Sequence, residues 1–293
     1  MHPAPTRAES VAPVALTGDH LSLRYGTHPV VHDVSVRLAS GRVTALVGPN
    51  GSGKSTLLRS LARLHPIDDG TLTLGAAERS AALLSAKDFA REVTLFAQSR
   101  PAPQGLTVRE IVAFGRHPYR RAFAGTSAED RDAVERAMSA TGVTVMASRP
   151  VGELSGGEMQ RVWLATCLAQ DTRVVLLDEP TNHLDLRYQV ETLDIVRDLV
   201  EEHDAAVGIV LHDLDHAARV ADEVLLLSDG RIHASGAAVD VLTAANITAV
   251  YDIPVAVGVD PVGGHIRIDP IGRHAARTSA DPTRIAPSRE DPS

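Results

Sequence analysis

The fold is decided by the stretch Val43-Thr44-Ala45-Leu46-Val47-Gly48-Pro49-Asn50-Gly51-Ser52-Gly53-Lys54-Ser55-Thr56. It joins an apolar run to a Gly-rich turn and then to a helical pattern. Glycines let the backbone bend so that successive N–H groups face one anion, and the new helix adds its positive dipole end. This is the frame of a phosphate-binding P-loop, in which Lys54 would bridge the outer phosphates and Ser55 would ligate Mg²⁺. The alternative is an ordinary Gly-rich turn. The chain has only one other lysine, Lys87, so a lysine at position 54 by chance is hard to credit.

The composition limits the class of protein. The 293 residues are 44% hydrophobic, enough for one large domain with an appendage or for two modest domains. A net charge of −8 argues against nucleic-acid binding, which favours a basic face. The one cysteine, Cys167, rules out an intrachain disulfide. Apolar runs are short and the N-terminus lacks a signal-peptide pattern, so we expect a cytoplasmic polypeptide that reaches a membrane only through a partner.

A second motif places two carboxylates after a buried strand. Four apolar residues, 174–177, precede Asp178 and Glu179. Ligands gather at the carboxyl ends of strands in open α/β sheets, so both acids are expected beside the P-loop. Asp178 is placed to hold Mg²⁺ and its water shell, and Glu179 to orient and deprotonate an attacking water. The alternative is a solvated acidic pair at a strand end.

A third motif, Leu154-Ser155-Gly156-Gly157-Glu158, begins another helix. Ser155 can cap it, and the two glycines expose its first N–H groups, which makes a second anion-binding helix end. Because the P-loop already cradles one nucleotide, the natural use of this end is the γ-phosphate of another subunit. The alternative is an ordinary capped helix, since this sequence is also good capping chemistry.

The order of these motifs resembles that of ATP-binding cassette (ABC) ATPase subunits. The resemblance spans roughly residues 18–270, and the Leu-Ser-Gly-Gly-Glu element is its specific part. The motifs that carry it, in chain order, are the P-loop, Gln98, Leu154–Glu158, Leu176-Leu177-Asp178-Glu179-Pro180, Asn182-His183-Leu184-Asp185 and Leu211-His212-Asp213.

The resemblance implies a role for each matched residue. Glu179, His212 and Gln98 would be catalytic, with His212 contacting the γ-phosphate, and Ser55, Gln98 and Asp178 would hold Mg²⁺. Tyr25 would stack on adenine, although it could simply end a strand. Asp185 would act across a dimer. The residues implied to contact ATP are Tyr25, Gly48, Pro49, Asn50, Gly51, Ser52, Gly53, Lys54, Ser55, Thr56, Ser155, Gly156, Gly157 and Asp185.

The same resemblance implies an α/β P-loop NTPase fold with a mainly parallel core sheet, an antiparallel N-terminal β subdomain and an inserted helical subdomain. We expect the ABC ATPase domain over 17–272, its helical subdomain at about 99–170, and disordered tails at 1–16, which are rich in Ala, Pro and Ser, and 273–293. The local patterns also predict a helical region over roughly 107–141 and a hairpin around Asp229-Gly230. The implied cofactors are ATP and Mg²⁺. The implied partners are a second ATPase subunit in a homodimer, integral-membrane permease subunits and, indirectly, a substrate-binding protein, with no nucleic acid. This places the chain peripherally at the cytoplasmic face of the cell membrane.

A finer assignment depends on residues 106–119, which include Gly115-Arg116-His117-Pro118. This stretch is similar to the "GRxP" region of cassettes in iron–siderophore importers, so ATP-driven uptake of such complexes is the favoured function. Relatives that carry haem, cobalamin or metal ions share much of the pattern. A soluble cassette, for example in iron–sulfur cluster assembly, is the rival from another class.

One metal-site alternative also arises from the pattern. His212 and His216 have the i, i+4 spacing of a helical zinc pair, with two aspartates nearby. We favour the γ-phosphate contact for His212 because this residue ends a buried strand.

Overall fold

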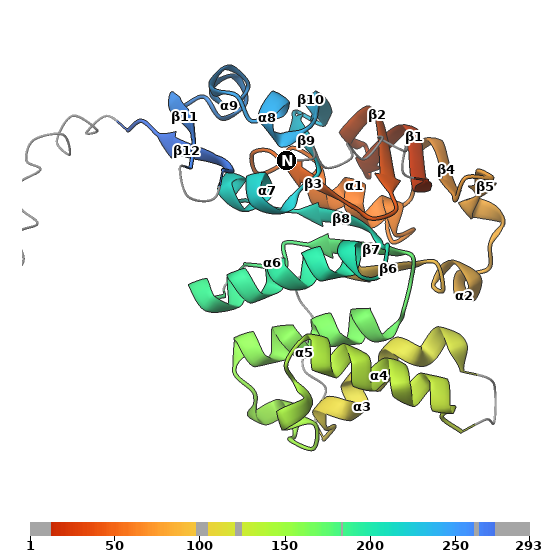
Figure 1. The fold of residues 1–293 in the computed structure, drawn as a ribbon. Coiled ribbons are helices and arrows are strands. Elements are labelled where there is room, and N and C mark those ends of the chain that lie inside the picture. Colours follow the sequence, from red (N-terminus) through yellow and green to blue (C-terminus); the bar gives the residue numbers. More distant parts are fainter. Residues whose placement is uncertain (1–12, 98–104, 121–124, 183, 261–263, 273–293) are drawn as a thin grey trace, which may run out of the picture.

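A mainly parallel sheet forms the centre of the molecule (Figure 1). The computed structural model describes residues 13–97, 105–120, 125–182, 184–260 and 264–272. Strand order in the central sheet is β10-β9-β3-β8-β7-β6, parallel throughout except for the β9–β10 edge. The bounds are β3 Arg42–Val47, β6 Val93–Phe96, β7 Val174–Asp178, β8 Ala206–Val210, β9 Glu223–Ser228 and β10 Arg231–Gly236.

The register of this sheet positions the site. Asp178 at the end of β7 pairs with Val210 at the end of β8, and Val210 pairs with Leu46 of β3. Strands β7 and β8 are buried along their whole length, as expected of parallel strands covered on both faces. The loops after β3, β7 and β8 therefore start side by side at one edge.

An antiparallel sheet of order β2-β1-β4-β5 packs beside the central one, at the upper right of Figure 1. Its strands are β1 Val14–Tyr25, β2 His28–Ala39, β4 Asp69–Leu74 and β5 Arg79–Ser80. β1 begins at Val14, before the start at residue 17 that the composition predicted. The reason is packing: Leu16 is buried and pairs with Leu38 on one side and Leu74 on the other.

A group of helices at the bottom of Figure 1 has a hydrophobic cluster of its own. We call these elements the helical group: α3 Val108–Val112, η2 Ala113–Tyr119, α4 Ala128–Ala140, η3 Thr144–Met146, η4 Val151–Glu153 and α5 Gly156–Ala169. The helices α3 and α4 lie within the predicted helical region 107–141, but the prediction missed that η2 ends at Tyr119 and that Arg120 is extended. Pro118 explains the early end because it has no N–H for a helical hydrogen bond.

The remaining elements complete the core around the central sheet. They are α1 Lys54–Leu61, η1 Ala81–Leu83, α2 Ala86–Phe89, α6 Leu186–Glu201, α7 Leu214–Val220, α8 Ala238–Val241, α9 Ala244–Tyr251, β11 Val255–Val259 and β12 Ile266–Pro270. The predicted hairpin is confirmed as β9–β10. The β11–β12 hairpin attaches to α7, since the Asp215 carboxylate accepts from the Ile268 N–H at 2.9 Å.

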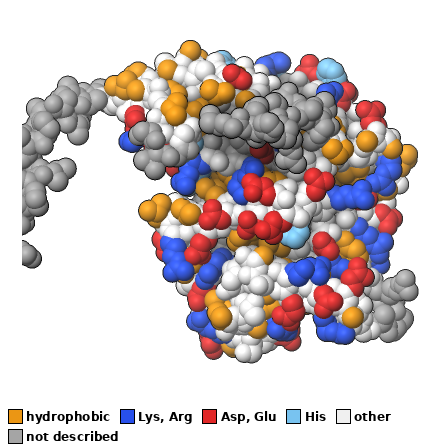
Figure 2. Space-filling view, in the orientation of Figure 1, with side chains coloured by type: hydrophobic (Ala, Val, Ile, Leu, Met, Phe, Trp, Pro, Cys, Tyr) orange, Lys and Arg blue, Asp and Glu red, His pale blue; other side chains and the backbone are white. Residues whose placement is uncertain are grey.

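The distribution of surface charge and the character of the helices bear on the kind of partner. On the face in Figure 2, acidic side chains lie among basic ones rather than apart from them. Among the described residues, no helix has the length and apolar character needed to cross a membrane.

Leu176 is fully buried at the centre of β7, which makes it a test of this core. Leu176→Ala is expected to lower the free energy of unfolding by about 2–5 kcal/mol, because the cavity it leaves cannot fully collapse. Urea unfolding followed by circular dichroism would measure it. Leu186→Ala is the control, because Leu186 is 75% exposed and its loss should change stability by less than about 0.5 kcal/mol. Equal effects of the two substitutions would contradict the assigned core.

Candidate functional site

The loop between β3 and α1 adopts a tight conformation that requires Gly48. The residue has φ 143°, and a Cβ there would lie 2.1 Å from the Leu227 carbonyl oxygen. The loop therefore runs against the end of β9 with no room for a side chain. It ends at Lys54, the first residue of α1, so the amino end of that helix faces the loop. A helix amino end beside a turn of backbone N–H groups suits a phosphate.

Lys54 is held inside this loop. Lys54 is 5% exposed, and its Nζ donates to the carbonyl oxygens of Gly48 and Pro49, each at 2.8 Å. Burial lowers the pKa of Lys54, and the carboxylates of Glu179 and Asp178 act in the opposite direction. The Ser52 hydroxyl beside it is buried without a hydrogen-bond partner in the described part of the chain. A buried ammonium and an unpaired hydroxyl in one loop fit an anionic ligand.

Asp178 is a buried carboxylate with two partners from α1. Asp178 is 1% exposed. The Ser55 hydroxyl donates to Asp178 Oδ1 at 2.7 Å, and Arg59 Nη2 lies 3.1 Å from Asp178 Oδ2. A hydroxyl and a carboxylate oxygen side by side are hard oxygen donors, the type Mg²⁺ prefers. The donor set of Ser55 and Asp178 thus fits the expected metal ion.

Glu179 has a strained backbone and a constrained side chain. Its φ is +55°, in the left-handed region that is costly for a residue with a Cβ. The Glu179 N–H donates to the Val210 carbonyl at 3.2 Å, which extends the β7–β8 ladder by one step. Asn182 Nδ2 donates to Oε2, and His212 Nε2 lies 2.5 Å from Oε1. The two side chains hold the carboxylate from both sides.

His212 does not belong to a helical metal pair. It precedes α7, which begins at Leu214, so the i, i+4 helical spacing with His216 does not apply. Among the described residues, no cluster of three or more His, Cys, Asp or Glu side chains could hold a metal ion.

The predicted second anion-binding end lies at the start of α5. The Ser155 hydroxyl accepts from the Glu158 N–H, and the Glu158 side chain accepts from the Ser155 N–H, which completes a capping box. Ser155 and Gly156 are exposed. The capping alternative is therefore present in the structure, and it leaves the helix end facing solvent. Asp185 is also exposed and caps α6 through the Tyr188 N–H at 3.0 Å.

Tyr25, the residue predicted to stack on adenine, lies at the end of a strand. Tyr25 ends β1, is 49% exposed, and its ring lies 4.5 Å from the His65 ring between centroids. An exposed aromatic surface at this edge could accept a base. Gln98 lies outside the described residues, as does His183.

The structure adds Arg59, which was not expected at the site, and a contact for Asn182, which the sequence identified only as part of a motif. Arg59 lies one helical turn after Ser55 on α1, so both side chains reach Asp178. Asn182 lies three residues after Glu179 and its amide bonds that carboxylate at 2.5 Å. The i, i+4 spacing was a usable signal for Arg59, whereas the contact of Asn182 depends on the turn after β7.

The fold and this site define a P-loop nucleotide-hydrolysing domain. The family model described as "ABC transporter" matches residues 31–182. The chain is 41% identical over 92% of its length to the ferric enterobactin transport ATP-binding protein of Escherichia coli (strain K12), of which it covers 98%. It is 44% identical over 86% of its length to the cobalamin import ATP-binding protein of Halobacterium salinarum (strain ATCC 29341 / DSM 671 / R1), of which it covers 61%.

A solved structure agrees with these relatives. A metal-chelate type ABC transporter in an inward-facing conformation superposes with a TM-score of 0.74 at 26% identity, over 89% of this chain and 98% of that chain. The chain belongs to the ATP-binding subunits of the ABC transporter family. As a member it binds ATP and hydrolyses it to drive transport, which confirms the predicted family, the α/β P-loop fold and the enzyme class.

Lys54 offers a test of the phosphate loop with a matched control. Lys54→Ala is expected to weaken ATP binding about tenfold to hundredfold, because a hydrogen bond to a charged group contributes about 1.5–3 kcal/mol. Titration of a fluorescent ATP analogue would measure the affinity. Lys87→Ala is the control, because Lys87 is exposed and donates to the Arg120 carbonyl. Unchanged affinity in Lys54→Ala would overturn the loop's role.

Proposed function

We propose that this chain is the ATP-hydrolysing subunit of an importer for iron–siderophore complexes, and that it acts through a separate membrane permease. The observation that carries the proposal is the 41% identity to the ferric enterobactin subunit, of which 98% is covered. The match covers 271 residues, so it extends beyond the P-loop through the helical group. The subunit would be peripheral, at the cytoplasmic face of the membrane.

Cobalamin is the second candidate cargo. The observation in its favour is the 44% identity to a cobalamin import subunit, although this chain covers 61% of that protein. The cargo does not touch the cassette in either case, since recognition would lie in the permease and an external binding protein. The two candidates therefore predict the same chemistry at the ATP site.

The proposed chemistry assigns the described groups around ATP. The loop from Gly48 to Lys54 would bind the phosphates, and Tyr25 would stack on adenine. Ser55 and Asp178 would hold Mg²⁺ together with Gln98, and the ion would neutralise charge on the outer phosphates. Asp178 is prepared for this role, because Ser55 and Arg59 already orient its oxygens.

Glu179 would orient and deprotonate the attacking water. Its carboxylate lies at the end of β7 with Asn182 on one oxygen and His212 on the other. His212 would contact the γ-phosphate, and its hydrogen bond to Glu179 would couple the two groups. Asn182 would act as a positioning residue, because its contact is with Glu179.

The proposed active form is a homodimer. Ser155, Gly156 and Asp185 are exposed, and the amino end of α5 carries the partial positive charge that suits a phosphate. In a head-to-tail pair, each P-loop would face the Ser155–Gly157 end of the other copy. Neither copy alone would then surround the γ-phosphate, so hydrolysis would require pairing.

Glu179→Gln tests this arrangement. The variant is expected to lose about 10²–10⁴ of the hydrolysis rate, because it removes the general base, and to stay dimeric with ATP bound. Sedimentation velocity with and without ATP would measure pairing, and phosphate release would measure the rate. A variant that remains monomeric at saturating ATP would contradict the dimer, and one with full activity would contradict the role of Glu179.

A cleft between the core and the helical group supports docking on a permease. It has a volume of about 520 Å³ and is lined from both sides, by Leu64, Phe89 and Leu95 of the core and by Phe114 and Trp163 of the helical group. Leu64 is 68% exposed and Phe114 is 47% exposed. Exposed apolar residues around a cleft indicate a protein contact, and a short helix from a permease loop is the proposed occupant.

Leu64→Asp tests the permease contact. A carboxylate at the cleft is expected to reduce recovery of the complex with the permease at least about tenfold, because burying it unpaired is costly. Activity of the isolated cassette should be unchanged. Val239→Asp on α8 is the control, since Val239 is 66% exposed and lies away from the cleft. Equal recovery of both variants would contradict docking at this cleft.

Vesicles that contain the whole importer would then decide the cargo. ATP-dependent uptake of a ferric siderophore, but not of cobalamin or haem, is the expected result. Uptake of cobalamin alone would favour the second candidate. Consistent recovery with a soluble iron–sulfur scaffold, and no permease, would favour the non-transport rival.

A further inference from the structure

The segment Gly115-Arg116-His117-Pro118 indicated an importer class from sequence, and in the structure it packs on the carboxyl end of α5. A Cβ at Gly115 would lie 2.1 Å from the Thr166 carbonyl oxygen, so the backbone of η2 touches α5 directly. The next side chain, Arg116, is 3% exposed although it carries a full charge. A buried guanidinium requires partners for its donors, and those partners show what the segment does.

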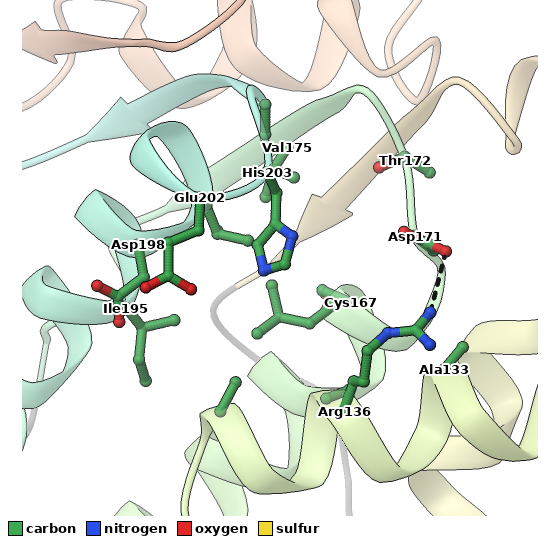
Figure 3. A pocket seen from close by; sticks show the side chains of 15 residues that line it. Ala133, Arg136, Cys167, Asp171, Thr172, Val175, Ile195, Asp198, Glu202 and His203 are labelled. Carbon is green, nitrogen blue, oxygen red and sulfur yellow. Dashed lines mark ion pairs between the residues drawn. The ribbon is translucent and has the colours of Figure 1, made fainter.

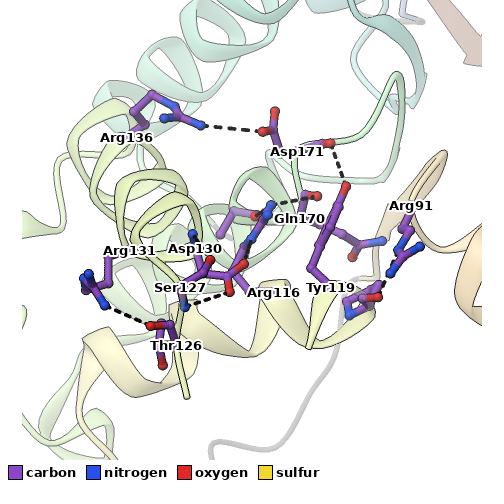
Figure 4. Close-up of polar contacts among 12 residues, drawn as sticks. Arg91, Arg116, Tyr119, Thr126, Ser127, Asp130, Arg131, Arg136, Gln170 and Asp171 are labelled. Atoms are coloured by element: carbon purple, nitrogen blue, oxygen red, sulfur yellow. Dashed lines mark hydrogen bonds and ion pairs between the residues drawn. The ribbon is translucent and has the colours of Figure 1, made fainter. Parts of the chain in front are cut away.

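Arg116 joins three elements of the helical group, as Figure 4 shows. Nε donates to Oδ1 of Asp130 in the first turn of α4 at 2.8 Å. Nη1 donates to the carbonyls of Ala169, at 3.0 Å, and Gln170, at 3.4 Å, which end α5. The guanidinium also lies 3.8 Å from the centre of the Tyr119 ring. Bonding to the last carbonyls of a helix satisfies acceptors that have no partner within it.

The pairing with Asp130 is a strong one. Both side chains are buried, at 3% and 9% exposed. The hydrogen bond from Arg116 is the largest cause that lowers the pKa of Asp130, while burial acts to raise it. Ser127 adds further hydrogen bonds to that carboxylate from the start of α4. Arg116 is therefore held in one orientation.

Gln170 extends this connection to the core. Its amide donates to the Ala90 carbonyl at 2.5 Å and to the Val93 carbonyl at 3.2 Å, and it accepts from the Thr94 hydroxyl at 3.0 Å. Arg91, in the same segment, donates to the Pro118 carbonyl at 3.0 Å. The carboxyl end of α5 is thus tied both to η2 and to the start of β6.

Space on either side of this end makes the polar contacts more important. On one side lies the cleft of about 520 Å³, which Thr166, Cys167 and Gln170 help to line. On the other side is a cavity of about 230 Å³ between α4, α5 and α6 (Figure 3), with Cys167 and Ile195 in its wall. Ala165 and Ala169 of α5 are buried, but the two spaces leave gaps in the packing beside this end of the helix, so polar contacts contribute more to its position.

We propose that Arg116 is a positioning residue that sets the direction of α5 and thereby the place of Ser155 and Gly156 at the other end. The inference rests on the proposed dimer, in which that end meets the partner's nucleotide. α5 has 14 residues and is therefore about 21 Å long. A tilt of about 10° at the contacts of Arg116, which we call the clamp, would therefore move the amino end of α5 by about 3–4 Å. Errors of about 1 Å in such contacts are costly to catalysis.

The experiment compares pairing with nucleotide binding. Arg116→Lys keeps the charge, but a lysine ammonium lacks the planar set of donors with which the guanidinium bonds Asp130 and the α5 carbonyls at the same time. The double variant Arg116→Met with Asp130→Asn removes the clamp without leaving a buried charge, and an asparagine can still accept from Ser127. The control is Arg109→Met with Glu135→Gln, an ion pair in the same helical group whose side chains are each 48% exposed.

All variants are made in the Glu179→Gln chain for pairing and in the natural chain for kcat and KM. Affinity for a fluorescent ATP analogue should stay within about twofold of the control, because the P-loop is untouched. The dimer dissociation constant should rise, and kcat should fall, by about threefold to thirtyfold, with Arg116→Lys between the control and the double variant. General destabilisation would instead weaken nucleotide binding together with pairing.

The outcomes separate the two proposals. A folded double variant, or Arg116→Lys if the double variant fails to fold, that pairs and turns over within about twofold of the control overturns the role of Arg116 alone. Loss of nucleotide affinity in parallel with pairing also overturns it, because the effect is then structural. If the Glu179→Gln parent itself does not pair with ATP, the dimer and the role of Arg116 are both overturned.

Discussion

The parallel register of β3, β8 and β7 is the constraint on which the rest of the molecule depends. It places Leu46, Val210 and Asp178 in one row, so the loops that follow these strands meet at a single edge. The hydrogen-bond ladder is buried, and a shift by one residue would move every side chain of the strand to the opposite face, where it would meet different packing partners. The P-loop, the two acids and His212 are close in space for that reason, although they span more than 150 positions of the chain.

Both buried charges at this edge have hydrogen-bond partners within the protein. The buried carboxylate of Asp178 has the Ser55 hydroxyl and the Arg59 guanidinium, and the buried Lys54 ammonium has two loop carbonyls. These contacts keep oxygen and nitrogen atoms oriented at positions that suit phosphate and a metal ion. The site is preorganised in this sense. The phosphate oxygens of ATP would replace these internal partners with little rearrangement of the protein.

The helical group has a different relation to the core. It has an apolar cluster of its own, although Leu164 and Cys167 of α5 belong to the cluster around the central sheet. Polar contacts near Arg116 and Gln170 also join it to the start of β6. A group of helices that packs mainly against itself can move as a unit. In the proposed dimer, such a movement would carry a change at the cleft to the partner's γ-phosphate, because α5 runs from that junction to the exposed Ser155.

The sequence alone determined the P-loop, the acidic pair, the capped start of α5 and the family, because each depends on residues that are adjacent in the chain. The prediction of a helical region over 107–141 missed the end of η2 at Tyr119, where Pro118 acts against a helix. The predicted start at residue 17 was too late, since Leu16 pairs within the sheet. Only the tertiary structure decided the partners of Asn182, Arg59 and Arg116. Arg116 meets Ala169, 53 positions away, and no periodic pattern encodes a contact between residues that far apart. Local chemistry can be recognised from order and spacing, whereas a buried charge finds its partners only when the chain has folded.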